Sequence, residues 1–205
     1  MKNKLKLAEA IGIILGDGNI YISKKHGCFQ LRIAGHSEDE KEYLWDFVKP
    51  LFEGLFNVNF YVKKHQSRNA LYVCCSKRSV IETLLEFGLK PSNESKNKST
   101  IPKWIKSKKN LLQACLRGLF DTDGCVYPLA PQYPNLLQIY FKNVNTKLLV
   151  EVRESLKRMG FHPSKICYNK IYITRKTEII KYLKEIGFNN PKHTKKIAPW
   201  CSGQA

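Results

Sequence analysis

Two short segments of the chain share one pattern, and both end in Asp-Gly. The first runs Ala8, Gly12, Gly16, Asp17, Gly18, and the second runs Ala114, Gly118, Thr122, Asp123, Gly124. Residues four apart lie on one face of a helix, so small residues at this spacing let two helix backbones approach closely. If the two segments pack on each other, Asp17 and Asp123 lie side by side. Two carboxylates at the negative ends of two helix dipoles are costly without a cation.

We predict a divalent-metal site formed by Asp17 and Asp123, with Gly16 and Thr122 as further metal ligands. Mg²⁺ prefers oxygen ligands and retains water, so one carboxylate from each segment suits it. A single Asp-Gly is more often a turn after a helix. Two of them at equivalent positions, after matching stripes of small residues, favour metal binding over that alternative.

The charge of the chain indicates a polyanionic partner. Lys and Arg total 35 against 17 Asp and Glu, for a formal net charge of +18. Such an excess is typical of proteins that bind nucleic acid or an anionic membrane. No apolar run approaches the roughly 20 residues that span a bilayer. The short apolar stretch Ala10–Leu15 lies between Glu9 and Asp17, unlike a signal peptide. Nucleic acid is therefore the predicted partner, with no membrane.

Seven cysteines give an odd count with no C-x-x-C pair. We expect reduced thiols in a cytoplasmic or other reducing intracellular setting, an organelle included, and no zinc site.

The order of predicted elements repeats after each Asp-Gly. In the first half we expect strands near Asn19–Ser23 and at Phe29–Ala34, a helix near Glu38–Phe52, strands Val58–Lys63 and Leu71–Cys75, and a helix Ser79–Phe87. In the second half we expect a short strand near Val126, a strand Leu136–Phe141, a helix Thr146–Met159, strands Lys165–Cys167 and Ile171–Thr174, and a helix Glu178–Ile186.

The fold class is therefore α+β, with a duplicated αββαββα order and pseudo-twofold symmetry. We expect a first half at 1–90, a linker at 91–109 and a second half at 110–205. The lysine-rich segments 91–103 and 189–199 each reach a proline, so the second is predicted to echo the linker at the end of the chain.

The predicted strands alternate apolar and polar residues, so each sheet has one covered and one open face. The open faces collect amide, aromatic and basic side chains, which read base edges and hold phosphates. An ordinary solvated face is the alternative, weakened by the scarcity of acidic residues there. The predicted contacts are Asn19, Tyr21, Ser23, Lys25, Gln30, Arg32, Asn59, Tyr61, Lys63, Tyr72, Tyr127, Gln138, Tyr140, Lys165 and Tyr172.

The segments Ala10–Gly18 and Leu116–Gly124 resemble the two motifs of the LAGLIDADG homing endonucleases. The first departs from the motif at Leu15, where the family often has an acidic or polar residue. The resemblance extends over nearly the whole chain. It implies a compact monomer whose two curved antiparallel sheets form a DNA-binding saddle in the major groove. The motif aspartates would lie beneath the minor groove of a long, asymmetric duplex target.

By the same resemblance the reaction is site-specific hydrolysis of both DNA strands, leaving short 3′ overhangs. Divalent metal ions shared between carboxylates activate water and neutralise charge on the reacting oxygens. The expected cofactor is Mg²⁺, with Mn²⁺ substituting and Ca²⁺ supporting binding without cleavage.

Four further residues match positions where the family places basic or polar groups near the cleaved bond. Lys98 resembles the inter-motif lysine of intein-borne relatives, and Lys195 is its counterpart in the second half, with Lys196 an equal contender. His36 and Lys142 end the second strand of each half. These lysines are equally well read as phosphate contacts or solvated side chains, and His36 as the start of the following turn.

Two other function classes stay open. The alternatives to an endonuclease are an RNA maturase with intron RNA as partner and a DNA-binding regulator whose motif acids no longer cut. Retention of both Asp17 and Asp123 argues against the second. Because the ends carry no splicing residues, we expect a free-standing protein encoded within an intron rather than an intein fragment. Walker loops, H-E-x-x-H and nucleophile elbows are absent from the sequence.

Overall fold

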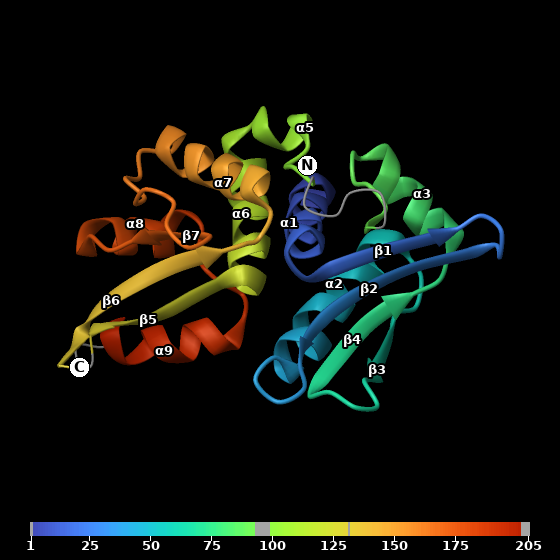
Figure 1. The fold of residues 1–205 in the computed structure, drawn as a ribbon, viewed down its shortest axis with the longest axis horizontal. Coiled ribbons are helices and arrows are strands. Elements are labelled where there is room, and N and C mark those ends of the chain that lie inside the picture. Colours follow the sequence, from blue (N-terminus) through green and yellow to red (C-terminus); the bar gives the residue numbers. More distant parts are fainter. Residues whose placement is uncertain (1, 93–98, 131, 202–205) are drawn as a thin grey trace.

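The computed structural model describes residues 2–92, 99–130 and 132–201, in two halves that each begin with a motif helix (Figure 1). The first half contains α1 (Lys2–Asp17), β1 (Gly18–Ser23), β2 (Cys28–His36), the π-helix η1 (Tyr43–Val48), α2 (Lys49–Phe56), β3 (Tyr61–Lys64), β4 (Ala70–Cys75) and α3 (Arg78–Glu86). The short helix α5 (Lys103–Lys106) then leads to the second half. That half contains α6 (Lys109–Asp123), β5 (Gly124–Ala130), β6 (Tyr133–Lys142), α7 (Thr146–Arg158), β7 (Lys170–Ile173), α8 (Lys176–Glu185) and α9 (Pro191–Cys201).

The two motif helices α1 and α6 pack side by side at the centre of the molecule (Figure 1). Their contact requires glycine at two positions. A Cβ added at Gly12 would overlap the carbonyl oxygen of Cys115, and one added at Gly118 would overlap that of Glu9. Because the neighbour in each case is backbone, it cannot rotate away. The predicted stripe of small residues therefore brings the ends of the two helices together.

Each half carries one antiparallel sheet, as predicted. The first sheet has the strand order β1-β2-β4-β3, and the second has the order β5-β6-β7. Ile20, Leu31 and Val73 of the first sheet, like Val126, Ile139 and Ile171 of the second, are almost fully buried. The alternate residues point to the opposite face of each sheet, so both sheets have the one covered face that their alternation predicts.

The predicted strand Lys165–Cys167 does not form, and the second sheet has three strands instead of four. Only an isolated bridge joins Cys167 to Lys170, and Ile166 is 36% exposed instead of buried. Tyr168 and Asn169 have positive φ angles of 46° and 58°, which turn the chain tightly just before β7. Pro163 removes a backbone donor just before this stretch.

The second difference concerns segment 189–199, which was predicted as an echo of the linker. Most of it belongs to helix α9, which spans Pro191–Cys201. Asn190 precedes the helix, and its Oδ1 accepts a hydrogen bond from the backbone N of Lys192 at 3.1 Å. Asparagine before the first turn and proline at its first position are a typical helix start. No helix in the described parts of the chain is long and apolar enough to cross a membrane.

Candidate metal and nucleic-acid site

Asp17 and Asp123 are the last residues of α1 and α6, so the close packing of these helices brings their carboxylates together. A Cβ built on Gly16 would lie 3.3 Å from Oδ2 of Asp123, and it would overlap the side chain of Thr122. Both aspartates keep part of their surface exposed. The geometry therefore places two carboxylates at the seam between the halves, open to solvent on one side.

The surroundings of the two carboxylates disfavour negative charge. Burial, and next to it the charge of Asp123, raises the pKa of Asp17 to about 7. Burial also raises the pKa of Asp123 to about 6, although a hydrogen bond from Asn143 opposes the shift. Glu40 adds to the repulsion at both residues. A cation between these groups would relieve that repulsion, so the residues present fit a divalent metal ion.

The carboxylates would need further ligands from outside the chain. Among the described residues no group of three or more His, Cys, Asp or Glu side chains is arranged to hold a metal ion. Hard divalent cations accept water and phosphate oxygens in addition to one or two carboxylates. The donor set is therefore that of a site completed by a phosphate-bearing ligand.

Lys192 is the basic residue that the structure brings to the two aspartates. Its ammonium donates to Oε1 of Glu40 at 2.6 Å and to the carbonyl oxygen of Thr122 at 3.2 Å. Its charge lowers the pKa of both Asp17 and Asp123, against the effect of burial. Glu40 follows β2 and Lys192 belongs to α9, so this ion pair joins the two halves of the chain.

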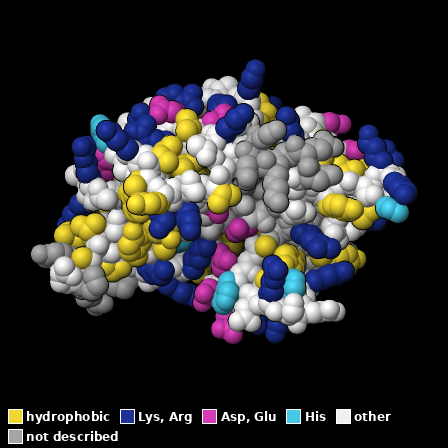
Figure 2. All heavy atoms as spheres, viewed as in Figure 1, with side chains coloured by type: hydrophobic (Ala, Val, Ile, Leu, Met, Phe, Trp, Pro, Cys, Tyr) yellow, Lys and Arg dark blue, Asp and Glu magenta, His cyan; other side chains and the backbone are white. Residues whose placement is uncertain are grey.

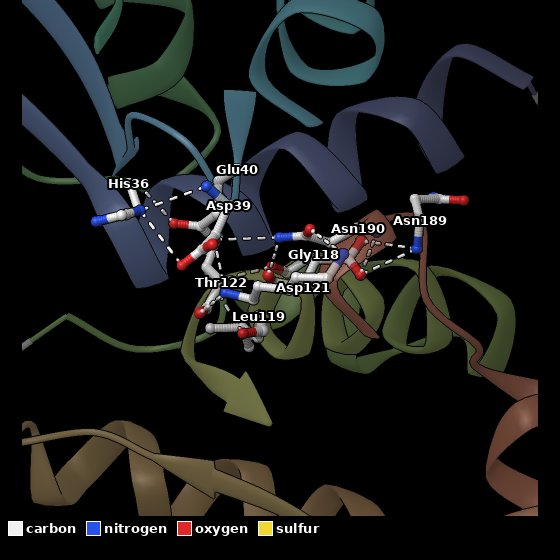
Figure 3. A network of polar contacts seen from close by, with 10 residues as sticks. His36, Asp39, Glu40, Gly118, Leu119, Asp121, Thr122, Asn189 and Asn190 are labelled. Carbon is white, nitrogen blue, oxygen red and sulfur yellow. Dashed lines mark hydrogen bonds and ion pairs between the residues drawn. The ribbon is translucent and has the colours of Figure 1, made fainter. Parts of the chain in front are cut away.

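A buried polar network around Asp121, Asn189 and Asn190 fixes the start of α9 (Figure 3). Lys192 lies in the first turn of that helix. The carboxylate of Asp121 accepts hydrogen bonds from the backbone N of Asn189 at 2.9 Å and of Asn190 at 3.1 Å. The side-chain amide of Asn190 donates to the carbonyl oxygen of Asp121 at 2.8 Å and to Glu40 at 3.1 Å. Burial raises the pKa of Asp121 to about 7, although these two backbone donors oppose the shift.

A pocket of about 410 Å³ opens beside Asp123, at the seam between the halves. Its wall includes Gly16 and Asn19 from the first half and Lys142 and Asn143 from the second. Nδ2 of Asn143 donates to Oδ2 of Asp123 at 2.7 Å, which fixes the orientation of that carboxylate. Lys142 is exposed and projects from the end of β6 into this region. The predicted neighbourhood of Lys142 and Asp123 is thus present.

His36 ends β2, as predicted, and takes part in the turn that follows (Figure 3). Its backbone N donates to Oε2 of Glu40 at 2.9 Å, and its Nδ1 accepts from the backbone N of Asp39 at 3.3 Å. Its side chain is 42% exposed. The alternative reading of His36, as the start of a turn, therefore describes its contacts in this structure.

The predicted lysines of the two lysine-rich segments have different outcomes. Lys98 lies outside the described residues. Lys195 forms an ion pair with Glu42 at 2.7 Å, and its side chain is 71% exposed. Lys196 is also exposed, on the same helix. In this segment Lys192, and not Lys195, contacts the groups around the aspartates, because α9 turns it toward Glu40 and Thr122.

Thr122 is engaged in other contacts. Its hydroxyl donates to the carbonyl oxygens of Gly118 and Leu119 at 3.1 and 2.9 Å, and its own carbonyl accepts from Lys192. These contacts fix the Thr122 side chain, and its role as a metal ligand stays a prediction. A side chain at position 16 would overlap that of Thr122, which explains why glycine is needed there. The role of Gly16 as a metal ligand stays a prediction.

Most predicted contacts of the first sheet lie on one exposed face. In the register Asn19 pairs with Arg32, Tyr21 with Gln30, and Lys63 with Tyr72, so these side chains form neighbouring rows. Tyr61 is 62% exposed and Tyr21 is 45% exposed. Ser23 lies at the end of β1, Lys25 lies in the exposed turn beyond it, and Asn59 is exposed just before β3.

The second sheet departs from its prediction at two positions. Gln138 is only 7% exposed, because it lies opposite Tyr127 in the register and on the same face of β6 as Tyr140. Its amide donates to the carbonyl oxygen of Leu129 at 3.5 Å. Lys165 is exposed but precedes the sheet, since its predicted strand does not form. Tyr127, Tyr140 and Tyr172 do share the open face, as their pairing shows.

The sequence prediction did not include Lys192, Glu40, Asn143 or Asn190. The one local signal for them was Asn190-Pro191, which marks the start of α9 and therefore the turn on which Lys192 lies. Glu40 and Lys192 are 152 positions apart, so no local pattern could pair them.

The raised pKa values predict how pH and metal ions affect stability. The aspartates have pKa values of about 7 and 6 in the folded chain against an ordinary value of 3.8, so ionisation disfavours the folded state. Without metal, the melting temperature should therefore fall as the pH rises from about 4 to about 7. Ca²⁺ should raise it by several degrees at the upper end of this range and much less at the lower end.

This effect is measured by thermal unfolding with Ca²⁺ or with chelator across the pH range. The Asp17→Asn/Asp123→Asn variant is the control. It should lose the response to Ca²⁺ and keep only a weaker pH trend, because Asp121, whose pKa burial also raises to about 7, is still present. A response of the same size in that variant would place the Ca²⁺ elsewhere.

Comparison with known proteins finds a LAGLIDADG-like domain in the second half of the chain. A family model described as a LAGLIDADG-like domain matches residues 110–187. Two proteins of Methanocaldococcus jannaschii are similar in sequence. One is a DNA polymerase, 30% identical over 130 residues that cover 58% of this chain and 7% of the polymerase. The other is an uncharacterized protein, 27% identical over 77% of this chain and 49% of its own length. The chain thus spans at most about half of these curated relatives.

Solved structures share the fold over most of the chain. Variants of the homing endonuclease I-DmoI superpose with a TM-score of 0.62 at 18% identity, covering 91% of this chain and 97% of theirs. I-DmoI has also been crystallised with DNA and Mn, and with DNA and Ca. The N-terminal LAGLIDADG domain of DUF199/WhiA superposes with a TM-score of 0.56 at 17% identity, over 90% of this chain and 82% of that domain.

Proposed function

We propose that this chain, which has a LAGLIDADG-like domain at 110–187 and the two-motif LAGLIDADG fold over nearly its whole length, is a site-specific DNA endonuclease that requires a divalent metal ion. The observation that carries the proposal is the pair Asp17 and Asp123 at the ends of two packed motif helices. Their surroundings raise the pKa of both and so favour a cation. We propose a monomer organised as halves 1–90 and 110–205 around the linker 91–109, acting on a long, asymmetric duplex.

Each residue of the site has a proposed part in hydrolysis. Asp17 and Asp123 would hold Mg²⁺ or Mn²⁺, which supplies an activated water and neutralises charge on the scissile phosphate. Asn143 orients Asp123 through its hydrogen bond. Lys192 provides a fixed positive charge beside the carboxylates, suited to a phosphate oxygen that gains charge in the transition state. Lys142 and His36 lie at the exposed ends of β6 and β2. They would contact the phosphates on either side of the scissile phosphate.

The open faces of the two sheets would follow the duplex on both sides of the cleaved bonds. The net charge of +18 supports this contact with duplex DNA, because a strongly basic chain attracts a polyanion. In a homing endonuclease the two strands are cut to leave short 3′ overhangs, and a role in intron homing would follow from that activity. Asp17 and Asp123, which suit a metal ion, favour this reading over an inactive regulator.

Lys192 should matter more for cleavage than Lys195. Lys192→Met removes the one charge that contacts both Glu40 and the Thr122 carbonyl, and should lower the cleavage rate about a hundredfold. Lys195→Met removes a charge paired with Glu42 on the surface and should change the rate little. Single-turnover cleavage rates under saturating Mg²⁺ measure both. Equal losses in the two variants, or no loss in Lys192→Met, would contradict the assignment of Lys192.

Binding to duplex DNA should weaken steeply with salt. Each phosphate contact adds a log–log slope of about −0.9 on duplex DNA, so a protein that follows the groove along both sheets should show a slope of several units. Affinity for a selected duplex is measured in Ca²⁺ at several salt concentrations, with structured RNA as competitor. A shallow slope would contradict the extended contact with the groove, and tighter binding to RNA would support a maturase instead.

A further inference from the structure

The open faces of the two sheets differ in the chemistry that they present. In the first sheet Gln30 and Arg32 lie on neighbouring rows, and neither side chain makes a hydrogen bond or ion pair with another described residue. Lys63 is likewise exposed on the same face. The first sheet therefore presents unpaired amide, guanidinium and ammonium donors to whatever covers it.

In the second sheet several polar groups of the open face are already engaged, although Lys142, at the end of β6, is exposed. Gln138 is buried, and its amide reaches the carbonyl oxygen of Leu129. The ammonium of Lys170 lies 4.8 Å from the centre of the Tyr140 ring. The ring centres of Tyr127 and Tyr140 are 5.4 Å apart in an edge-on arrangement, and Tyr172 is 6.0 Å from Tyr140 on the other side. These contacts engage the Gln138 amide and the Lys170 ammonium, and they pack the three tyrosine rings against one another.

Among its described residues, the end of the second sheet away from Lys142 exposes large apolar side chains. Leu136 lies two residues before Gln138 on β6 and is 46% exposed, and Leu129 is 47% exposed at the end of β5. Figure 2 shows hydrophobic side chains gathered over the half of the molecule that carries this sheet. Monomeric proteins seldom keep such a row of rings and leucines open to water without use. The tyrosines of the first sheet, by contrast, are not packed into a row of this kind.

We propose that the two half-sites of the target are read in different ways. This inference rests on the proposed function, because it needs duplex DNA on both open faces. Under the first sheet, Arg32 and Gln30 read purine edges by hydrogen bonds to guanine and adenine in the major groove. Under the second sheet, Leu136 and the rings of Tyr127 and Tyr140 read the C5-methyl groups of thymine by apolar contact. The chain thus recognises its target by hydrogen bonds on one side and by methyl groups on the other.

Modified bases separate the two kinds of contact without altering Watson–Crick pairing. A duplex selected from a randomised library in Ca²⁺ is remade in four versions. In two of them deoxyuridine replaces thymine in one half-site, which removes only the methyl groups. In the other two 7-deazaguanine replaces guanine in one half-site, which removes only the N7 acceptor. Dissociation constants are then measured for all four.

Deoxyuridine should weaken binding only in the half-site under the second sheet. 7-Deazaguanine should weaken binding only in the half-site under the first sheet. Deoxyuridine should cost about fourfold for each contacted thymine, and 7-deazaguanine at least about fivefold at the guanine that Arg32 reads. Leu136→Ala should remove the dependence on the methyl groups, and Arg32→Ala the dependence on N7. Val150→Ala and Arg158→Ala, on α7, are matched controls that should retain both.

The outcomes distinguish this inference from the proposed function. Equal sensitivity of the two half-sites to each modification, or insensitivity of both, would overturn the inference while duplex binding stands. Failure to bind any duplex would overturn the proposed function and the inference with it. The wild-type measurements alone decide the matter, so the result does not depend on how well the variants fold.

Discussion

Asp17→Asn and Asp123→Asn should each lower double-strand cleavage by at least about a hundredfold while leaving Ca²⁺-supported binding of duplex DNA nearly unchanged. Each substitution keeps the shape of the side chain and removes the charge that a divalent cation needs. Neither removes a positive charge from the sheet faces, so affinity for the duplex should persist. Cleavage of a selected duplex in Mg²⁺ and affinity in Ca²⁺ are measured on the same preparations.

The matched control for this prediction is Asp46→Asn, at an exposed position of η1. It makes the same chemical change outside the site and should leave cleavage unaltered. Loss of binding or of folding in the Asp17 and Asp123 variants, without a separate defect in cleavage, would contradict the metal role. The variants should in fact be more stable than the wild type without metal near neutral pH, because the repulsion between the carboxylates is removed.

Gly12→Ala and Gly118→Ala should each destabilise the fold by at least about 2 kcal/mol. The added Cβ would overlap a backbone carbonyl oxygen of the partner helix, so α1 and α6 would have to move apart. Because these helices position Asp17 and Asp123, cleavage should fall as well, even at temperatures where the variants stay folded. Denaturant unfolding measures the loss of stability, and cleavage is measured below the unfolding transition.

Gly54→Ala provides the control for both glycine variants. Gly54 lies within α2, and a Cβ added there meets no atom within 4 Å. The same substitution should therefore stabilise the protein by up to about 1 kcal/mol, because alanine favours the helix. If Gly12→Ala or Gly118→Ala behaved like Gly54→Ala, the close packing of the motif helices would not be needed for stability.

The sequence allowed much of the fold to be predicted because two signals agreed. Small residues at every fourth position indicated a close helix pair, and the strands that follow each Asp-Gly alternate apolar and polar residues in the same order. Both signals are local, so they can be read without knowing the tertiary contacts. The alternation also predicted which face of the first sheet stays open, since Tyr21, Gln30 and Arg32 all fall there.

The second half was harder to predict, for physical reasons at particular residues. Alternation at Lys165–Cys167 suggested a strand, but the positive φ angles of Tyr168 and Asn169 make a turn instead. The polar, lysine-rich sequence of 189–199 concealed helix α9, whose described residues include the buried Ile197. Gln138 falls on the open face by register yet is buried, because large rings lie on either side of it.

Only part of the basic surroundings of the candidate site could be read from the sequence, because Lys142 was predicted and lines the pocket beside Asp123, whereas Lys192 was not predicted. Lys192 becomes a site residue through Glu40, which comes from the other half of the chain, and through a helix start fixed by Asp121. Such contacts come from distant parts of the chain and leave no local pattern. The aspartates depend on where their own helices end and on a helix pairing that the stripes of small residues already predict. The carboxylates could therefore be predicted and Lys192 could not.

The proposed endonuclease activity is tested most directly by cleavage of a randomised duplex library. The library is incubated with the wild-type protein in Mg²⁺, in EDTA, and in Mg²⁺ with the Asp17→Asn/Asp123→Asn variant, and the product ends are sequenced. We expect cuts in both strands at one long, asymmetric sequence, with 3′ overhangs, and only for the wild type in Mg²⁺. Tight, sequence-specific binding without cleavage in Mg²⁺ or Mn²⁺ would contradict the proposal and favour a regulator, or a maturase if intron RNA binds better than the duplex.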